Sequence, residues 1–152
     1  MPRVNFGTYS LEAPETWTLS SVILAGPVDE APAKGMVSTK AVRPFQRNLI
    51  TTMERVGAKE TCESYLQKQL EGLREAGIQR LEGKPAEKVT LGGTAGLLTE
   101  QIIPGPGGER VRQMQLITIK DGIAHVVIAS HLDGVPFEAA RAEFRNMLLS
   151  FQ

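Results

Sequence analysis

The segment from Phe45 to Gly77 constrains the fold of this chain most, because it changes from the period of a strand to that of a helix. Over residues 46–55 the pattern repeats every two residues, which is typical of a β-strand. Apolar residues then recur at helical spacing, namely Cys62, Leu66, Leu70 and Leu73. Thr61 is a suitable N-cap, and Gly77 suits the left-handed residue that ends a helix. We expect a strand followed by a one-sided amphipathic helix over about 61–76.

The sequence after this helix predicts a meander of strands and one further helix. Alternating runs bounded by turn residues lie at 87–91, 95–103, 111–120 and 123–132, after a weaker run at 79–82. Pro136 then suits the first turn of a helix. Its apolar stripe comprises Phe137, Ala140, Phe144, Met147, Leu148 and Phe151.

The sequence before Phe45 predicts two strands and a long loop. The strands are expected over 5–11 and 18–25. Residues 28–44 read mainly as a loop, in which Met36–Val42 could add an edge strand. The element order is therefore β-β-β-α-β-β-β-β-α. It indicates an α+β fold: a single-domain antiparallel sheet of about six or seven strands, with two main helices packed on one face.

Composition excludes several classes of protein. The chain has 152 residues, enough for one domain with one core. Its 17 basic and 17 acidic residues balance, which disfavours nucleic acid as a partner. The N-terminus has no apolar signal region, and no apolar run is long enough to insert into a membrane. The lone Cys62 cannot form an internal disulfide, so we expect a cytoplasmic protein.

The residues that could carry chemistry are few, and we expect neither catalysis nor a cofactor. His125 and His131 are roughly 20 Å apart along an extended strand, too far to share a metal. Cys62 continues an apolar helix stripe, so a Cys62 nucleophile with His125 as its base is disfavoured. The glycines at 105–108 lack the lysine and the helix of a phosphate loop. No catalytic or metal-binding residue is predicted.

The strands are apolar on both faces, which is unusual for a sheet with helices on one side only. Over 111–120, Met114 and Leu116 alternate with Gln113, Gln115 and Ile117. A second face of this kind is suited to a binding partner. It could instead be closed by the 28–44 loop or by a second copy of the chain.

The pattern NLITTMER, ETCESYLQKQLEGL, VTLGGTAGLLTEQ and a closing pair of strands with a helix resembles a known family. It is similar to DcrB-like domains of the PsbP-like fold, most closely to the bacterial Eag chaperones that accompany type VI secretion effectors. The resemblance covers nearly all of 1–152, as a single DcrB-like domain. It implies a homodimeric, cytoplasmic, non-enzymatic adaptor that binds the apolar N-terminal helices of an effector on its sheet face.

The resemblance also implies client-binding residues. Val22 and Leu24 match the apolar pair after the family's tryptophan, and Gln69 matches the glutamine of its helix motif. Either Gln115 or Gln113 matches the glutamine of its hairpin strand, and Ile117 extends the same face. Two other functions stay open: a DcrB-like protein-binding or structural module with another partner, and a small esterase-like or metal enzyme.

Overall fold

The computed structural model describes residues 3–6, 9–12, 20–25 and 45–151, with side chains from Phe45 onward. The strands are β1 (Arg3–Phe6), β2 (Tyr9–Glu12), β3 (Ser20–Ala25), β4 (Asn48–Arg55), β5 (Glu82–Gly83), β6 (Glu87–Leu91), β7 (Thr94–Pro104), β8 (Arg110–Lys120) and β9 (Ile123–Leu132). The helices are α1 (Cys62–Glu75) and α2 (Val135–Leu149). The predicted loop 28–44, with the possible edge strand Met36–Val42, lies outside the described residues.

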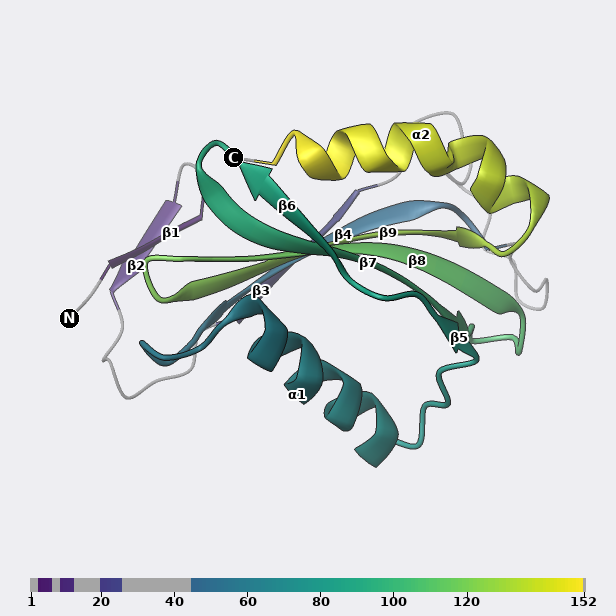
Figure 1. Cartoon of the computed structure of the whole chain (residues 1–152), viewed down its shortest axis with the longest axis horizontal. Helices are drawn as coiled ribbons and strands as arrows, with labels where there is room; N and C mark the ends of the chain where they lie inside the picture. Colours follow the sequence, from purple (N-terminus) through teal and green to yellow (C-terminus); the bar gives the residue numbers. More distant parts are fainter. Residues whose placement is uncertain (1–2, 7–8, 13–19, 26–44, 152) are drawn as a thin grey trace, which may run out of the picture.

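In the described part of the chain, seven strands form one antiparallel sheet in the order β3-β4-β9-β8-β7-β5, and β6 also pairs with β7 (Figure 1). This arrangement confirms the predicted α+β class and the order of the strand and helix blocks. The single strand expected at 5–11 is instead the separate antiparallel pair β1–β2. Short turns join the three long strands β7, β8 and β9 into an antiparallel meander. This meander forms the centre of the sheet.

The two helices lie on opposite faces of the sheet, so the expectation that both pack on one face is wrong (Figure 1). Leu116 and Val127 pack in the cluster with α2, whereas Ile117 and Val126 pack in the cluster with α1. Successive residues of a strand point to opposite faces, and here each face has its own helix. The apolar residues on both faces are explained by this three-layer arrangement.

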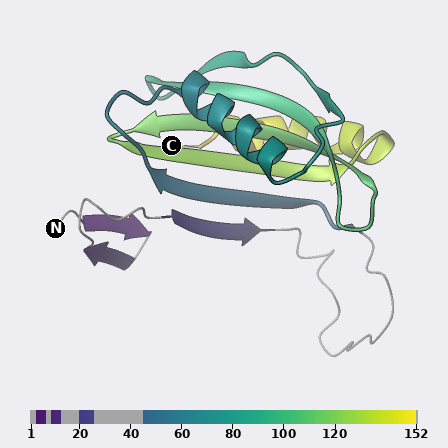
Figure 2. The same ribbon diagram turned by 90° about the horizontal axis from the view of Figure 1, so that it is seen from below.

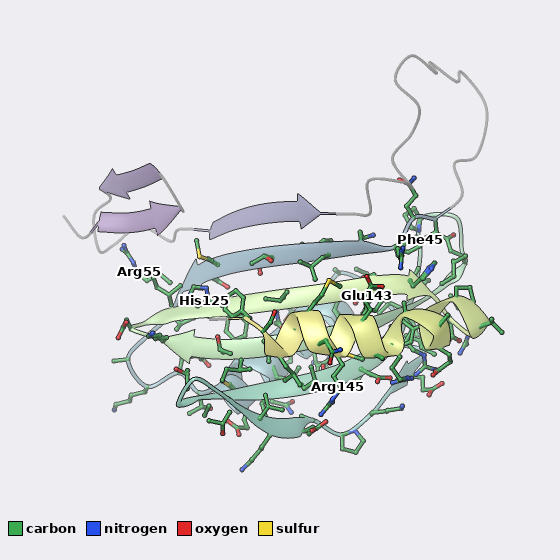
Figure 3. The ribbon with its side chains drawn as sticks, turned by 90° about the horizontal axis from the view of Figure 1, so that it is seen from above. Phe45, Arg55, His125, Glu143 and Arg145 are labelled. Carbon is green, nitrogen blue, oxygen red and sulfur yellow. The ribbon has the colours of Figure 1, made fainter. Side chains whose placement is uncertain are left out.

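Helix α2 covers the larger core. Its buried side chains, Phe137, Ala140, Phe144 and Leu148, pack on Leu98, Met114, Leu116, Val127 and Ala129 of the sheet. The Phe137 and Phe144 rings meet edge to face, with centroids 5.7 Å apart. Glu143 of α2 binds Arg47, and Arg145 binds Glu87. Glu143 and Arg145 lie on opposite sides of the helix (Figure 3). Each large apolar side chain buried here contributes roughly 1.5–3 kcal/mol, which makes this layer the principal stabilising one.

Helix α1 begins and ends as the sequence predicts. The Thr61 hydroxyl accepts a hydrogen bond from the Ser64 amide at 3.1 Å, and the Ser64 hydroxyl accepts one from the Thr61 amide at 3.0 Å. At the other end, Gly77 has φ +73°. Tyr65, which is 8% exposed, is the only buried residue of α1. The N-terminus of α1 is therefore well fixed, although the helix as a whole covers little of the sheet.

A network of charged groups joins α2 to the sheet at the start of the helix. Arg112 and Arg141 lie over the ring of Phe137, 5.8 and 5.1 Å from its centroid. Both arginines bind the Glu100 carboxylate, and Arg112 also donates to Asp133 at 2.8 Å. Burial alone would raise the pKa of Glu100, but bonding to Arg141 and Lys84 lowers it. The hydrogen bond from Arg112 likewise lowers the pKa of Asp133.

This network predicts acid sensitivity. A carboxylate whose pKa is lower in the folded chain than in the unfolded chain stabilises the fold at any pH above its unfolded pKa of about 4. This stabilisation is lost as the pH falls through the folded pKa. The urea midpoint should fall as the pH drops below about 5. Glu100→Gln should cost about 2 kcal/mol at pH 7 and should flatten the acid limb. The exposed Glu71→Gln is the control, and an unchanged acid limb in Glu100→Gln would contradict the assignment.

Candidate functional site

Strand register places the six predicted site residues on one side of the molecule, the side covered by α1. One row across the sheet runs Leu24, Ile50, Ile128, Gln115 and Thr99. The adjacent row runs Val22, Thr52, Val126, Ile117 and Leu97. Residues that pair directly across strands share a face. The sixth residue, Gln69, reaches this face from α1.

Gln69 and Gln115 bind each other. The Gln115 side-chain amide donates to the Gln69 oxygen at 2.6 Å, and Gln115 is only 4% exposed. The neighbouring Gln113 belongs to a different set: it accepts from the Gln101 amide at 3.1 Å and donates to the Ser130 hydroxyl at 3.4 Å. The two glutamines that the sequence left as alternatives therefore share a face but have separate partners.

Ile117 supports α1 from beneath. It has no exposed surface and packs in a cluster with Tyr65, Ala124 and Val126. The Tyr65 hydroxyl donates to the Glu54 carboxylate at 2.8 Å, which ties α1 to β4. Burial together with the Glu54 carboxylate raises the pKa of Tyr65. In this conformation Ile117 positions the helix and presents no surface to a partner.

The accessible part of this face lies beside α1. In Figure 2, β4 and β3 lie alongside the helix and not under it. Ile50, Thr52 and Ile128 are partly exposed there, and we call these three residues the β4–β9 surface. By register it continues into β3 at Val22 and Leu24, whose side chains lie outside the described part. The surface is mainly apolar and ends at the glutamine side chains.

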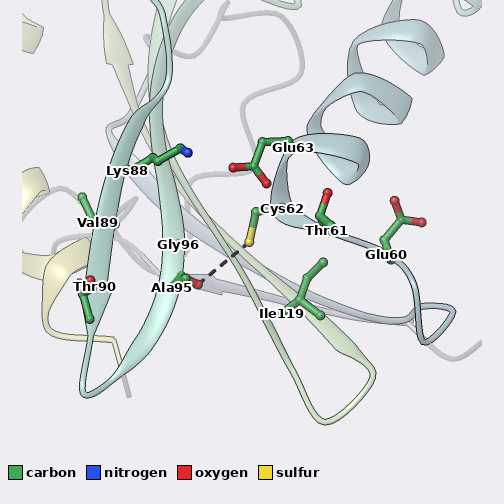
Figure 4. Close-up of a pocket in the computed structure, with 10 residues that line it drawn as sticks. All are labelled: Glu60, Thr61, Cys62, Glu63, Lys88, Val89, Thr90, Ala95, Gly96 and Ile119. Atoms are coloured by element: carbon green, nitrogen blue, oxygen red, sulfur yellow. Dashed lines mark hydrogen bonds between the residues drawn. The ribbon is translucent and has the colours of Figure 1, made fainter.

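The residues considered for catalysis lie apart. Cys62 lines a pocket of about 500 Å³ at the start of α1, where its thiol is 3.9 Å from the Ala95 carbonyl oxygen (Figure 4). Burial raises the pKa of this thiol, with a further contribution from Glu63. His125 lies on the opposite face of the sheet, against Phe151 of the chain's end. Cys62 and His125 therefore do not form a nucleophile–base pair in this structure.

A metal centre has no support in the described side chains. Among residues 45–151, no group of three or more histidine, cysteine, aspartate or glutamate residues could hold an ion. The His131 ring nitrogen Nδ1 accepts from the Leu132 amide at 2.9 Å.

In the described part of the chain, no helix has both the length and the apolar character needed to cross a membrane.

Sequence reasoning missed the polar partners of the predicted glutamines. Gln101, Ser130 and Asn48 lie in the same row as Gln113, on neighbouring strands. Their alternation could be read from the sequence, but their alignment requires the register of β4, β7, β8 and β9. The turn residues at 121–122 do fix one of these registers, that of β8 with β9.

Comparison with solved structures identifies the fold as PsbP-like. PA94 of Pseudomonas aeruginosa, a protein of unknown function, superimposes with a TM-score of 0.68 at 12% identity, over 100% of this chain and 96% of its own. CyanoP, the PsbP of the cyanobacterium Synechocystis sp. PCC 6803, superimposes with a TM-score of 0.55 at 11% identity, over 93% and 96%. No family model and no curated protein matches the sequence. At these identities the likeness concerns the fold alone.

The Gln69–Gln115 pair can be tested by a double-mutant cycle. Gln69→Leu should cost about 1–2 kcal/mol, because it leaves the buried Gln115 amide without its acceptor. The Gln69→Leu, Gln115→Leu double variant should recover most of this loss, because both partners become apolar. Gln67→Leu, on the exposed side of α1, is the matched control. If the losses in unfolding free energy of the two single variants, measured in urea, add up to the loss of the double variant, the two amides are not coupled.

Proposed function

We propose that this chain is a non-enzymatic adaptor that binds an apolar segment of a partner protein on the β4–β9 surface and its continuation into β3. The observation that carries the proposal is the row of Leu24, Ile50, Ile128 and Gln115, in which apolar residues lead directly to the glutamine that binds Gln69 of α1. A protein-binding module is the general class that this surface suits. The PsbP-like fold is compatible with that class and does not identify the partner.

In its more specific form, the proposal follows the resemblance of the sequence to Eag chaperones. The partner is then the N-terminal region of a type VI secretion effector, whose helices are apolar on their outer side. Such helices aggregate in water unless another protein covers them. Ile50 and Ile128, with Leu24 in the same row and Val22 in the adjacent one, would cover the apolar side chains. The resemblance also implies that glutamine amides bond the few polar groups of the client, which requires the hydrogen bond between Gln69 and Gln115 to open.

The remaining parts of the proposal concern assembly and location. We expect a cytoplasmic homodimer, so that two such surfaces shield the client helices together. No cofactor, nucleic acid or direct membrane insertion is part of this function. If a copurified partner proves to be a folded protein without apolar helices, the chain is a DcrB-like binding module of another kind.

Co-expression with the apolar N-terminal segment of the effector encoded beside this chain tests the proposal. The two proteins should copurify, and Val22→Asp or Leu24→Asp should reduce the yield of the complex at least about tenfold, because a charge is placed against an apolar segment. A gene for a spike protein or a PAAR-containing effector next to this one is also expected.

Ile23→Asp is the matched control, because it introduces the same charge into the same strand. By register Ile23 pairs with Thr51 and belongs to the other face of the sheet. Melting temperatures of all three variants show whether the fold is kept. Full copurification of both Val22→Asp and Leu24→Asp would exclude this surface as the binding site. Activity that depends on His125 or Cys62 would favour an enzyme instead.

A further inference from the structure

The sheet face that α2 covers continues beyond the last turn of the helix. Helix α2 ends at Leu149, and Phe151 packs on the core just beyond it. His125 lies beside this end of the helix (Figure 3). A cavity of about 800 Å³ opens here, and its walls come from the β6–β7 turn, the end of β8, the start of β9 and Phe151. Its volume is within the range of small-molecule sites in proteins.

Strand register places a histidine and a lysine of the cavity on the same face. In β9, His125 and Ile123 lie two and four residues before Val127, which packs in the cluster with α2. Lys120 of β8 pairs with Ile123. Alternate residues of a strand share a face, so the three cavity residues all lie on the α2 side. Lys120 is exposed, and His125 and Ile123 are partly exposed. The cavity therefore has an imidazole in its wall and a cation at its rim.

The His125 ring is neutral at pH 7 and offers one nitrogen to the cavity. Its Nδ1 is buried and has no hydrogen-bond partner among the described residues. Burial lowers the pKa of His125, and the charge of Lys120 lowers it further. A buried N–H without an acceptor is rarer in proteins than a buried acceptor without a donor, so we assign the proton of the neutral ring to Nε2. The Nε2–H group is then the donor that a ligand in the cavity can reach.

The cavity also has an apolar side with an aromatic corner. The Phe151 ring lies against the His125 ring, with centroids 5.5 Å apart and planes tilted by 52°. Ile123 and Leu91 add aliphatic surface to the walls. Rings at such an angle offer a face and an edge to a further aromatic group. This side of the cavity suits a ligand with an aromatic body.

We propose that this cavity binds a small aromatic carboxylate. The carboxylate accepts from the His125 Nε2–H group and from the Lys120 ammonium group, and the aromatic body packs on Phe151 and Ile123. An ionised carboxylate only accepts hydrogen bonds, which matches an N–H donor beside a cation. The Asp121 carboxylate at the rim repels a second negative charge, so dicarboxylates and phosphates fit less well. The cavity lies on the face opposite the β4–β9 surface, and this inference is independent of the proposed function.

Proton NMR tests the site with 1-naphthoate, an aromatic carboxylate, and with the uncharged 1-naphthamide. The chain has two histidines, so the Hε1 signal of His125 reports on the cavity and that of His131 is an internal control. Titration with 1-naphthoate should shift the His125 signal alone, with a Kd of about 1 mM or tighter. Bound naphthoate should also raise the pKa of His125, because it places a negative charge beside the ring. 1-Naphthamide should bind about tenfold more weakly and should leave this pKa unchanged.

Two variants separate the charged wall from the aromatic one. Lys120→Met should remove the preference for the acid over the amide, because the side chain keeps its length and loses its charge. Lys88→Met is the matched control and should keep the preference: Lys88 is also exposed, but it pairs with Leu97 on the α1 side of the sheet. Phe151→Ala should weaken the binding of both ligands alike, because it removes the aromatic wall.

Three results would overturn the site. The first is no shift of the His125 signal up to about 10 mM naphthoate. The second is an equal shift of both histidine signals, which would show non-specific binding. The third is equal affinity of the wild-type chain for the acid and the amide, which would show that no cation or N–H donor holds the carboxylate.

Discussion

The structure depends on the need to cover a sheet that is apolar on both faces. Strands β7, β8 and β9 bury large side chains on each side, so neither face is stable in water alone. Helix α2 covers one face with four buried residues, two of them phenylalanines. Helix α1 covers the other with one buried residue, Tyr65. This inequality leaves a partly exposed apolar surface beside α1.

The two helices differ in how much apolar packing attaches them. Apolar packing holds α2, and the arginines that lie over Phe137 and bind Glu100 add to it. Helix α1 packs a smaller apolar cluster around Tyr65 and Ile117 on the sheet, and the hydrogen bonds from Tyr65 to Glu54 and from Gln115 to Gln69 add to it. A few directed hydrogen bonds specify position and contribute less free energy than a packed core.

Much of the fold could be predicted from local patterns. The change of period after Phe45 located β4 and α1 within one or two residues, and Thr61 and Gly77 act at the two helix ends as expected. Periodicity also showed that both sheet faces are apolar. Periodicity could not assign the helices to faces. An apolar stripe shows that a helix packs on the sheet, but the loops that join the helix to its strands decide which face it reaches. The error of placing both helices together arose there.

The site was predictable only in part, for a related reason. Gln69, Gln113 and Gln115 stood out in the sequence, yet their partners are set by hydrogen bonds across strands far apart in the chain. Ile117 was apolar and on the correct face, but the helix above it makes it part of the core. The cavity beside His125 has no signal in the sequence, because its walls come from parts of the chain that are far apart.

The uneven cover has a consequence for how the molecule opens. Local opening costs least where few apolar contacts are broken, so we expect opening of the α1 layer to cost less than opening of the α2 layer. The sheet is therefore supported more firmly from the α2 side than from the α1 side.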